Sequence, residues 1–498
     1  MNISDPIRLH ARQRPDAPAV IRTDGTTVTY RGLDRRIDAL AGRLLDSGLR
    51  PGNTVALAIS RPYPFVALAF ALARVGVASA PPTLPAEHTD LCVTEAGTPT
   101  GGGTKAIPLA EIWTKGLSSG VAVPPVASHD DGTAVFHIFP SSGTTGNPKH
   151  VAITHDMVAR RVLSRGLMAP LPDNPVQICT IGFGSHFGFK SLLRVLWAGG
   201  LVVLPGKPVA KRVPALIRRH RVNYLVTSAF TLERIIASLP PGAAPFPSLV
   251  GIEFGGSLMP RQVYDLARQR LCASIVSLYG TTESGAIASA PMAELIGHPG
   301  AVGRVHRSVE IRTADADGNP LPPATEGILW VRTDTCVPCY FGDTNASASA
   351  FRDGWFCTGD TGTVSSDGLL TLAGRTSELI NNGGDKVSPR VIEDVLSSQP
   401  GIREAAAFGA PDATGVIRVW AAIVTDGPVD MPALTVLCNQ RLKHNAPRFI
   451  MKMKALPRNE AGKILRDRLI GKAIEGLAAG SRRRAAGNAP GSGGRDSP

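Results

Sequence analysis

Short apolar runs and longer helical stretches follow one another along most of the chain. Residues 55–59, 178–181, 201–204 and 224–227 have the length and composition that favour strands, and residues 27–30 begin the series. Residues 33–47 are predicted to be helical, and the apolar run at 65–80, which Arg74 interrupts, predicts a buried helix. Strands and helices that alternate in this order predict an α/β fold.

The pattern changes twice further along the chain. Residues 305–332 are predicted to form short strands and turns, including strands at 309–311 and 328–331. From about residue 378 the alternation returns, with a predicted helix at 389–397 and a strand at 419–424. Residues 86–106 are polar and rich in glycine, which predicts a surface connection.

Size and composition are those of a globular enzyme. The 498 residues predict about two to four domains, and the hydrophobic content of 43% is ordinary for such a protein. No apolar run reaches the ~20 residues that span a bilayer. The first residues lack a secretory signal, so the expected location is cytoplasmic. Seven cysteines without a repeated spacing argue against a disulfide framework.

The net charge of +13 favours an anionic partner. Residues 476–498 contain Arg482, Arg483, Arg484 and Arg495 among Gly, Ala, Ser and Pro, and we expect a disordered basic tail there. A basic excess can indicate nucleic acid, but no nucleic-acid-binding module is recognised. Small anionic substrates such as ATP or coenzyme A are therefore the preferred interpretation.

The segment at residues 140–149 is the most informative motif. It follows the apolar run 134–139 and precedes the apolar residues 151–153, so it is predicted to be a loop between two strands. Its glycines let successive N–H groups surround an anion, and its hydroxyls and lysine add donors and positive charge. It lacks the Walker spacing, and a solvated linker is the alternative. The candidate phosphate-binding residues are Ser141, Ser142, Gly143, Thr144, Thr145, Gly146 and Lys149.

Two further motifs close predicted strands. In residues 277–284, Tyr279 can stack on a base, Thr281 and Thr282 can bind phosphate, and Glu283 can hold Mg²⁺. The alternative for this segment is a helix N-cap with an acidic first turn. Gly255 and Gly256, followed by Ser257, permit either the close approach of a flat ring or a simple turn.

Three charged residues near turns are also candidates. Asp360, behind a Thr-Gly turn, suits the hydroxyls of a ribose, and its alternative is a solvated acid at a strand edge. Arg375 offers a guanidinium for phosphate or ribose oxygens, or else a surface salt bridge. Lys463 follows a glycine in a predicted loop and, taken alone, is a surface lysine.

Together, and in this order, the motifs at residues 140–149, 279–283, 355–360, 374–375 and 462–463 resemble those of the acyl-adenylate-forming superfamily. This superfamily includes acyl- and aryl-CoA synthetases, luciferases and peptide-synthetase adenylation domains. The resemblance runs from about residue 29 to residue 469. It implies a large N-terminal domain (1–374) of α/β subdomains with a small β-barrel. It further implies a hinge (375–378) and a small mobile α+β C-terminal domain (379–475) before the tail at 476–498.

The resemblance also implies a reaction and its site residues. A carboxylic acid attacks the α-phosphorus of ATP, with Mg²⁺, to give acyl-AMP and pyrophosphate, and a thiol then takes the acyl group. Residues 141–149 would hold the β- and γ-phosphates, and Tyr279 would stack on adenine beside Gly255, Gly256 and Ser257. Gly280 and Thr281 belong to the same segment as Thr282, which would touch the α-phosphate, and Glu283, which would bind Mg²⁺. Asp360 and Arg375 would bind the ribose, and Lys463 would bridge the carboxylate and the α-phosphate.

Departures from the family pattern bear on the substrate. Gly184 stands where amino-acid-activating domains carry an aspartate, so we expect an acid without an α-amino group, of fatty or aryl type. His186 resembles a histidine of CoA synthetases that gates the carboxylate site, and a packed histidine is the alternative. Ser377 occupies the hinge position, where Asp or Lys is usual.

The thiol acceptor is expected to be coenzyme A. A separate carrier protein with its phosphopantetheine is the alternative. An amino-acid-adenylating enzyme or a non-catalytic nucleotide-binding relative is less favoured, because Gly184 replaces the aspartate and both Lys463 and Glu283 are present.

Overall fold

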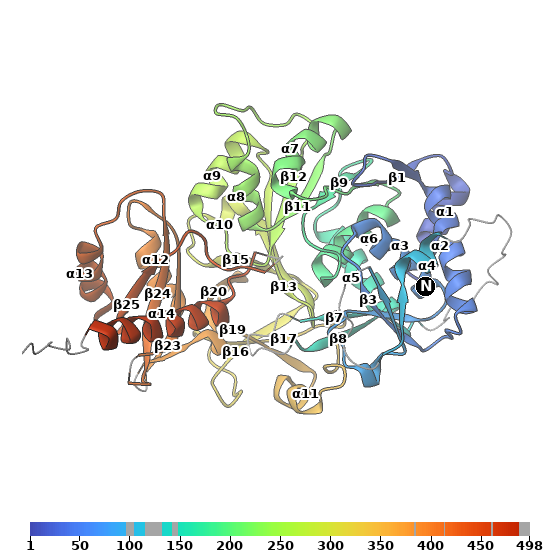
Figure 1. Ribbon diagram of the computed structural model, residues 1–498. Coiled ribbons are helices and arrows are strands. Elements are labelled where there is room, and N and C mark those ends of the chain that lie inside the picture. The colour runs from blue at the N-terminus through green and yellow to red at the C-terminus, as the bar shows by residue number, and fades with distance from the viewer. Residues whose placement is uncertain are drawn as a thin grey trace, which may run out of the picture. The chain divides into compact units, whose positions relative to one another are not determined.

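The computed structural model describes residues 1–95, 104–114, 132–141, 148–382, 385–412, 414–459 and 462–487. The chain divides into two compact units (Figure 1). Unit 1 comprises Met1–Thr358 and Gly362–Leu372, together with Gly462. Unit 2 comprises Gly359–Thr361, Ala373–Asn459 and the chain from Lys463 onward.

The largest sheet contains fourteen of the described strands. Strands β1, β10, β9, β11, β12 and β13 run parallel, and β14, β15 and β20 continue the sheet in antiparallel fashion. This antiparallel part continues the same sheet, and the small β-barrel implied by the family resemblance stays a prediction. The order of the strands is β16 (Glu310–Ala314), β17 (Gly327–Arg332), β19 (Trp355–Val364), β20 (Leu369–Arg375), β15 (Ala301–Val305), β14 (Gly285–Pro291), β13 (Ile275–Thr281), β12 (Gly251–Gly255), β11 (Tyr224–Thr227), β9 (Val176–Cys179), β10 (Leu201–Val203), β1 (Pro18–Ile21) and β2 (Thr27–Thr29), with β18 (Phe351–Arg352) beside β19.

A second sheet of unit 1 corrects one prediction. Its order is β6 (Ala106–Pro108), β5 (Leu91–Thr94), β3 (Thr54–Ala58), β4 (Ala78–Ala80), β7 (Val135–Pro140) and β8 (His150–Thr154). The prediction of a surface connection over residues 86–106 is therefore wrong for β5, whose residues Leu91, Cys92 and Val93 are buried between β3 and β6. The segment begins with the short helix η1 (Ala86–His88), and residues 96–103 lie outside the described part.

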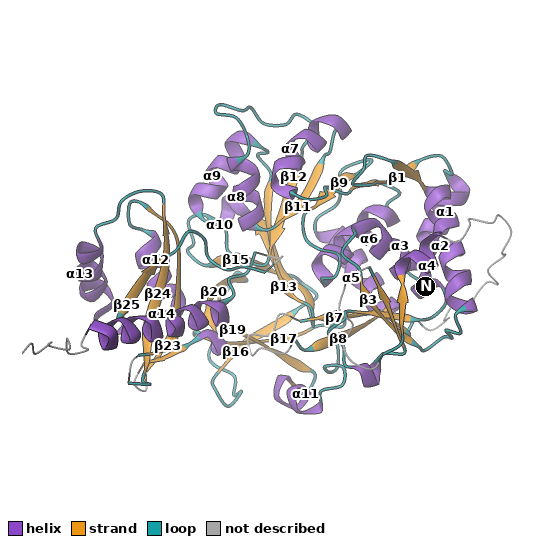
Figure 2. Cartoon of the chain, in the orientation of Figure 1, coloured by secondary structure: helices purple, strands orange, loops and turns teal. Residues whose placement is uncertain are grey.

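Helices pack on both sheets of unit 1 (Figure 2). One buried cluster joins side chains of α1, α2, α3 and α6 to β3 and β7, and a second joins α7, α8 and α9 to β9, β11 and β12. The helices are α1 (Asp5–Gln13), α2 (Tyr30–Asp46), α3 (Pro62–Arg74), α4 (Leu109–Thr114), α5 (His155–Met168), α6 (His186–Trp197), α7 (Val209–His220), α8 (Ala229–Ala237), α9 (Arg261–Arg270), α10 (Met292–Leu295) and α11 (Thr344–Ala350).

Helix α3 is shorter than predicted. The buried helix expected over residues 65–80 ends at Arg74, and Ala78–Ala80 forms β4 instead. Gly76 has a φ of +72°, which glycine adopts without steric cost and which turns the chain from the helix into the strand. Periodicity alone could not separate the two elements, because both are buried and apolar.

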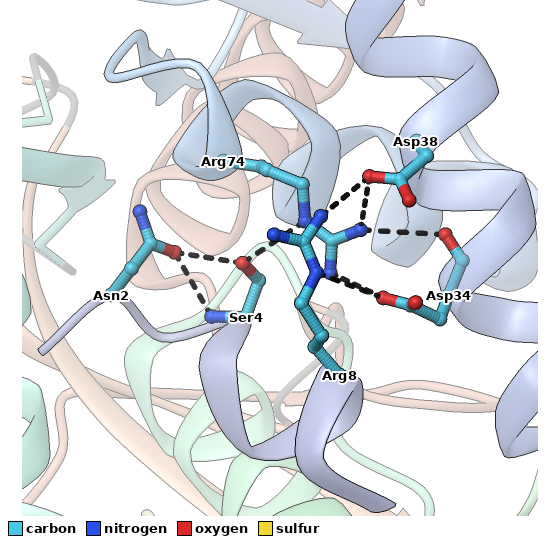
Figure 3. Close-up of polar contacts among 6 residues, drawn as sticks. All are labelled: Asn2, Ser4, Arg8, Asp34, Asp38 and Arg74. Atoms are coloured by element: carbon cyan, nitrogen blue, oxygen red, sulfur yellow. Dashed lines mark hydrogen bonds and ion pairs between the residues drawn. The ribbon is translucent and has the colours of Figure 1, made fainter. Parts of the chain in front are cut away.

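Arg74 is a charge within an apolar helix, and its partners explain why it is tolerated (Figure 3). Its side chain is 5% exposed and donates to Oδ1 of Asp34 at 2.7 Å and to Oδ1 of Asp38 at 2.7 Å, both on α2. Arg8 on α1 also contacts Asp38, at 2.7 Å, and Arg74 Nε donates to Ser4 Oγ at 3.3 Å. The network therefore fastens α1, α2 and α3 to one another.

Unit 2 is an α+β domain around the sheet β23 (Ile402–Pro411), β24 (Ile417–Thr425) and β25 (Phe449–Lys452). Because side chains alternate across a strand, Val419 and Ala421 pack with α12 (Pro389–Ser397) and α13 (Met431–Leu442). Trp420 and Ala422 pack in a separate cluster with α14 (Arg466–Gly487). The unit also contains β21 (Ile380–Asn382), β22 (Asp385–Val387), η2 (Thr376–Glu378) and η3 (Lys443–Asn445).

The tail differs in part from the expectation. Residues 476–487 continue α14 up to Gly487, whereas the composition predicts disorder, and residues 488–498 lie outside the described part. No helix in the described ranges is both long and apolar enough to span a membrane. All seven cysteines are free thiols.

Candidate active site

The ends of the glycine-rich loop lie on an antiparallel pair of strands. Pro140 on β7 pairs with His150 on β8, and Ser141 N donates to the carbonyl oxygen of Lys149 at 2.7 Å. The predicted strand–loop–strand arrangement is therefore confirmed at both ends of the loop. Ser142, Gly143, Thr144, Thr145 and Gly146 lie outside the described residues, so their contact with phosphate stays a prediction.

The segment 277–284 forms a hairpin between β13 and β14. Its strands pair from Val276 with Pro291 to Thr281 with Gly285, so the alternative of a helix N-cap is wrong. Thr281 Oγ1 accepts a hydrogen bond from Ser284 N at 3.0 Å and thereby closes the turn. Thr282 and Glu283 lie between the two strands at the tip of this hairpin.

Strands β12 and β13 bring the adenine candidates together. Gly255 lies opposite Leu278 in the parallel pairing, so Tyr279 and Gly256 follow at the same edge of the sheet. A Cβ atom at Gly255 would lie 2.9 Å from the carbonyl oxygen of Leu278 and 3.2 Å from Cε1 of Phe187. Gly256 has a φ of +85°, a conformation that L side chains rarely adopt. Larger residues would therefore disturb the strand end at which Tyr279 and Ser257 also lie.

Arg161 on α5 holds the tip of the hairpin in place. Its Nη1 donates to the carbonyl oxygen of Thr282 at 2.9 Å, and its Nη2 donates to that of Glu283 at 2.6 Å. Nη2 also donates to the carbonyl oxygen of Thr335 at 2.7 Å. The guanidinium is buried, and backbone carbonyls satisfy most of its donors. Arg161 thus positions the backbone that presents Thr282 and Glu283.

His186 is the first residue of α6, where Ser185 caps the helix by accepting from Gly188 N. Arg161 Nη1 lies 3.0 Å from His186 Nε2. Because a guanidinium only donates, Nε2 accepts and the proton of the neutral ring lies on Nδ1. Burial, with Arg161, Lys190 and His137 nearby, holds the pKa of His186 well below its usual value. His186 is therefore a neutral donor through Nδ1, and the lone pair on Nε2 is occupied.

Lys149 and Glu283 meet at Tyr340. Lys149 Nζ lies 4.7 Å from the centre of the Tyr340 ring, and the Tyr340 hydroxyl donates to the Glu283 carboxylate. Burial and that carboxylate raise the pKa of Tyr340 far above its usual value, so the hydroxyl keeps its proton. The last residue of the phosphate-loop candidate and the Mg²⁺ candidate therefore both contact Tyr340.

The carboxylates present fit a magnesium ion held mainly by a substrate. Within the described ranges, no group of three or more His, Cys, Asp and Glu residues is placed to hold a metal ion by itself. Glu283 can supply one carboxylate oxygen. This suits Mg²⁺, which usually keeps several waters and takes phosphate oxygens with only one or two carboxylates.

In unit 2, Asp360 and Arg375 form an ion pair. Arg375 Nε lies 2.6 Å from Asp360 Oδ1. Asp360 lies within β19 rather than in a turn at a strand edge, so that alternative is wrong. Thr376 Oγ1 donates to the carbonyl oxygen of Gly359 at 3.1 Å and holds the end of β20 beside β19. The two predicted ribose ligands are therefore adjacent to each other.

Lys463 also lies in unit 2 and has a charged partner. Its Nζ lies 3.3 Å from Glu378 Oε1, and Arg466 Nη1 contacts the other oxygen of Glu378 at 2.9 Å. Arg466 Nη2 in turn lies 2.7 Å from Glu393 Oε1. Burial, with Arg375 nearby, lowers the pKa of Lys463, and Glu378 opposes that shift. Lys463 is therefore not an isolated surface lysine, because its ammonium belongs to a half-buried ionic network.

Comparison with known proteins decides the family. The model of the AMP-binding enzyme family matches residues 7–341, and that of the AMP-binding enzyme C-terminal domain matches residues 391–463. The chain belongs to the AMP-binding enzymes.

Relatives of this family resemble the chain over nearly its whole length. A salicylyl-CoA synthase / salicylate adenylyltransferase from Streptomyces sp is 29% identical over 92% of this chain and 92% of its own. A fatty acid–[acyl-carrier-protein] ligase from Streptomyces coeruleorubidus is 28% identical over 92% of this chain and 94% of its own length. The solved O-succinylbenzoate coenzyme A synthetase from Bacillus subtilis, in complex with ATP and magnesium ion, has the same fold, with a TM-score of 0.81 at 24% identity over 93% of this chain and 98% of that one.

Three residues of the site were not predicted from the sequence. Arg161 and Lys190 are cations within helices, and Glu378 follows the hinge candidate Ser377. Each of the three lies near residues that are far away in the sequence, so no local sequence motif identifies it. Only Lys190 could have been noticed in the sequence, because it is a charged residue in the largely apolar stretch that follows His186.

Proposed function

We propose that this AMP-binding enzyme joins a carboxylic acid without an α-amino group to the AMP part of ATP and then transfers the acyl group to a thiol. The observation that carries the proposal is the meeting of Lys149 and Glu283 at Tyr340. Lys149, the proposed cation for the terminal phosphates, and Glu283, the proposed carboxylate for Mg²⁺, both contact this one side chain. A nucleotide triphosphate with its metal ion is the substrate that needs both.

In the first half-reaction, an oxygen of the substrate carboxylate forms a bond to the α-phosphorus. The bond from that phosphorus to the oxygen bridging to the β-phosphate breaks, and pyrophosphate leaves. Negative charge builds on the phosphate oxygens during this displacement, so cations positioned in advance lower the barrier. We assign this task to Lys463 and Lys149, with Thr282 donating to the α-phosphate. Mg²⁺, held in part by Glu283, would neutralise the phosphate oxygens.

The remaining residues position the two substrates. Tyr279, with Gly255, Gly256, Ser257, Gly280 and Thr281 around it, receives the adenine, and Asp360 with Arg375 receives the ribose. His186 donates from Nδ1 to the substrate carboxylate and has no role as a base, because its Nε2 lone pair accepts from Arg161. The enzyme contributes orientation and charge and needs no covalent nucleophile of its own.

In the second half-reaction, a thiolate sulfur bonds to the acyl carbon, and the bond from that carbon to the AMP oxygen breaks. We propose that unit 2 moves between the two half-reactions about residues 375–378. The division of the chain next to residue 373 supports this hinge. The corresponding domains are residues 1–374 and 379–475.

Charge near His186 supports an acid without an ammonium group. Arg161 and Lys190 both lie close enough to His186 to lower its pKa, and Gly184 contributes no carboxylate. A substrate ammonium would be repelled there, whereas a fatty or aryl acid would not. Coenzyme A is the proposed acceptor, and a carrier protein is the second candidate because one relative is a carrier-protein ligase. Use of ATP and coenzyme A fits a cytoplasmic location.

Pyrophosphate release tests this function. The full chain is incubated with ATP, Mg²⁺ and single acids from a panel of fatty, aryl and amino acids, without any thiol. We expect release with fatty or aryl acids and none with amino acids. Coenzyme A or a holo carrier protein is then added to the adenylate, and the acylated thiol is identified by mass spectrometry. Release with amino acids alone would contradict the substrate class, and no release with any acid would contradict the function.

A further inference from the structure

The glycine that precedes the proposed catalytic lysine packs on the start of α8. Gly462 belongs to unit 1, whereas Lys463, the next residue, belongs to unit 2. A Cβ atom at Gly462 would lie 2.9 Å from Cβ of Phe230 and 3.2 Å from Oγ of Ser228. The backbone at Gly462 is therefore in direct contact with both residues and leaves no room there for a side chain.

Strand pairing places this contact at the edge of the sheet where the adenine candidates lie. Thr227, the last residue of β11, pairs with Phe254, which precedes Gly255 on β12. Ser228 and Gly255 therefore follow at the same edge, on neighbouring parallel strands. In open α/β sheets the carboxyl ends of the parallel strands form the edge at which ligands bind. The contact thus lies beside the proposed adenine site.

The two partners of Gly462, which we call the Gly462 seat, are themselves held in place. Ser228 is buried and caps α8, because its Oγ accepts from Thr231 N at 3.2 Å. Phe230 is half-buried, and the guanidinium carbon of Arg234 lies 5.6 Å from the centre of its ring, one helical turn later. The helix cap and the cation thus fix the surface that Gly462 meets.

A closed turn links Gly462 to the lysine that follows it. Asn459 N donates to the carbonyl oxygen of Lys463 at 2.9 Å, and Lys463 N donates to Asn459 Oδ1 at 2.9 Å. Gly462 lies inside this turn with a φ of +82°, a conformation that L side chains rarely adopt. Because the two hydrogen bonds close the turn around it, a shift of Gly462 would move Lys463 as well.

We propose that the Gly462 seat positions Lys463 for the first half-reaction, with Ser228 and Phe230 as positioning residues. This inference rests on the proposed function and adds two residues to it. A lysine whose backbone is held against unit 1 has its ammonium oriented before charge builds at phosphorus. The seat serves that step alone, because unit 2 moves about residues 375–378 before the thiol step. Two competing roles are that Gly462 serves only its turn and that Phe230 only lines the acid pocket.

The first test separates the contact from the turn, with the full chain and an acid that the wild type activates. Gly462→Asn introduces a residue that tolerates a positive φ but adds a Cβ atom against the seat. We expect kcat for pyrophosphate release to fall about 10- to 100-fold. Single-turnover transfer from synthetic acyl-AMP to the thiol should stay within about a factor of three of wild type.

Gly415→Asn is the matched control for this variant. Gly415 has a φ of +83°, and a Cβ atom there would have no described atom within 4 Å. Its substitution therefore carries the same backbone cost without a contact, and we expect pyrophosphate release at the wild-type rate. Equal rates of release by Gly462→Asn and Gly415→Asn would overturn the inference, as would equal losses in both half-reactions of Gly462→Asn.

The second test is a double-mutant cycle on the two sides of the contact. Phe230→Ala should lower kcat for pyrophosphate release about 10-fold and leave the KM for the acid unchanged. Phe230→Leu, which keeps Cβ and a branched apolar end, should recover most of the rate. The variant that combines Phe230→Ala with Gly462→Asn should release pyrophosphate within about a factor of three of Gly462→Asn alone, because a lost contact cannot be lost twice.

The cycle also has outcomes that contradict the inference. A raised KM for the acid with an unchanged kcat, or effects of the two substitutions that multiply, would show that Phe230 lines the acid pocket instead. Leu216→Ala, at a half-buried position on α7, is the control for lost packing alone. If Phe230→Ala does not fold, the comparison of Gly462→Asn with its control decides. Each of these results leaves the proposed function intact, whereas no release by the wild type with any acid would contradict the function itself.

Discussion

Lys463 Nζ lies 3.3 Å from Oε1 of Glu378, so the proposed catalytic ammonium has an anionic partner within its own unit. Arg466 holds the other carboxylate oxygen, which fixes Glu378 in place. Glu378 opposes the lowering of the Lys463 pKa that burial and Arg375 cause. This carboxylate therefore helps to keep Lys463 charged for the displacement at phosphorus.

Glu378→Gln should shift the alkaline limb of the pH–rate profile. A lysine with a lowered pKa loses its charge at a lower pH than usual, and removal of Glu378 lowers that pKa further. We expect pyrophosphate release by the variant to decline at lower pH than in the wild type. Glu393→Gln is the matched control, because Glu393 contacts Arg466 but not Lys463. Superimposable profiles for Glu378→Gln and wild type would show that Glu378 does not tune Lys463.

Three buried histidines should make the protein less stable in acid. Burial lowers the pKa of His137 to about 3 and that of His306 to about 4, and it holds the pKa of His186 well below its usual value. The unfolded chain binds these protons with a pKa of about 6.5, so stability is full above that pH and falls as the pH falls. Each histidine removes about 1.4 kcal/mol per pH unit in that range.

Urea unfolding at pH 7.5 and pH 5.5 measures this dependence. We expect the free energy of unfolding to drop by about 4 kcal/mol between the two. His137→Gln should lower that drop by about one third, because it removes one of the three groups. A variant with the full wild-type pH dependence would contradict the assignment of His137.

Arg74→Met should destabilise the junction of α1, α2 and α3 (Figure 3). The change leaves Asp34 and Asp38 without the guanidinium that both contact at 2.7 Å. We expect a loss of about 3 kcal/mol in the free energy of unfolding. Arg8→Met is the control, since Arg8 is 31% exposed and should cost less than about 1 kcal/mol. Equal effects of the two substitutions would refute the special role of the buried arginine.

Ser377→Pro tests the proposed hinge. Proline fixes φ and removes the backbone donor, so it should restrict rotation about residues 375–378. We expect pyrophosphate release within about a factor of three of wild type but a larger loss of acyl transfer to the thiol. Single-turnover transfer from pre-formed adenylate separates the two steps, with Ser377→Ala as control. Equal losses in both half-reactions would argue against a hinge at this position.

Much of the fold follows from local sequence patterns. The strand at residues 224–227 and the helix at 389–397 have the predicted bounds, because each is a short apolar or amphipathic segment between clear breakers. Strand β5 was missed, since its three buried residues lie among polar and glycine-rich neighbours. The helix and strand within residues 65–80 could not be separated, because burial removes the contrast on which periodicity depends.

The site divides in a similar way. Lys149, Glu283, Asp360 and Lys463 were predicted because each belongs to a motif with its own composition. Arg161 was not, because its role depends on burial and on partners that only the folded chain brings near. Arg161, for example, contacts a carbonyl 121 residues away in the sequence. Such contacts leave no trace in any short segment.

The most direct test of the account is pyrophosphate release by Lys463→Ala. The ammonium neutralises charge that builds only during the displacement, so its loss should lower kcat about 100- to 1,000-fold. Binding of ATP, measured by calorimetry, should change little, and Lys454→Ala at an exposed position of unit 2 is the control. Acid-dependent pyrophosphate release at the wild-type rate in Lys463→Ala would contradict the central claim that this lysine serves adenylate formation.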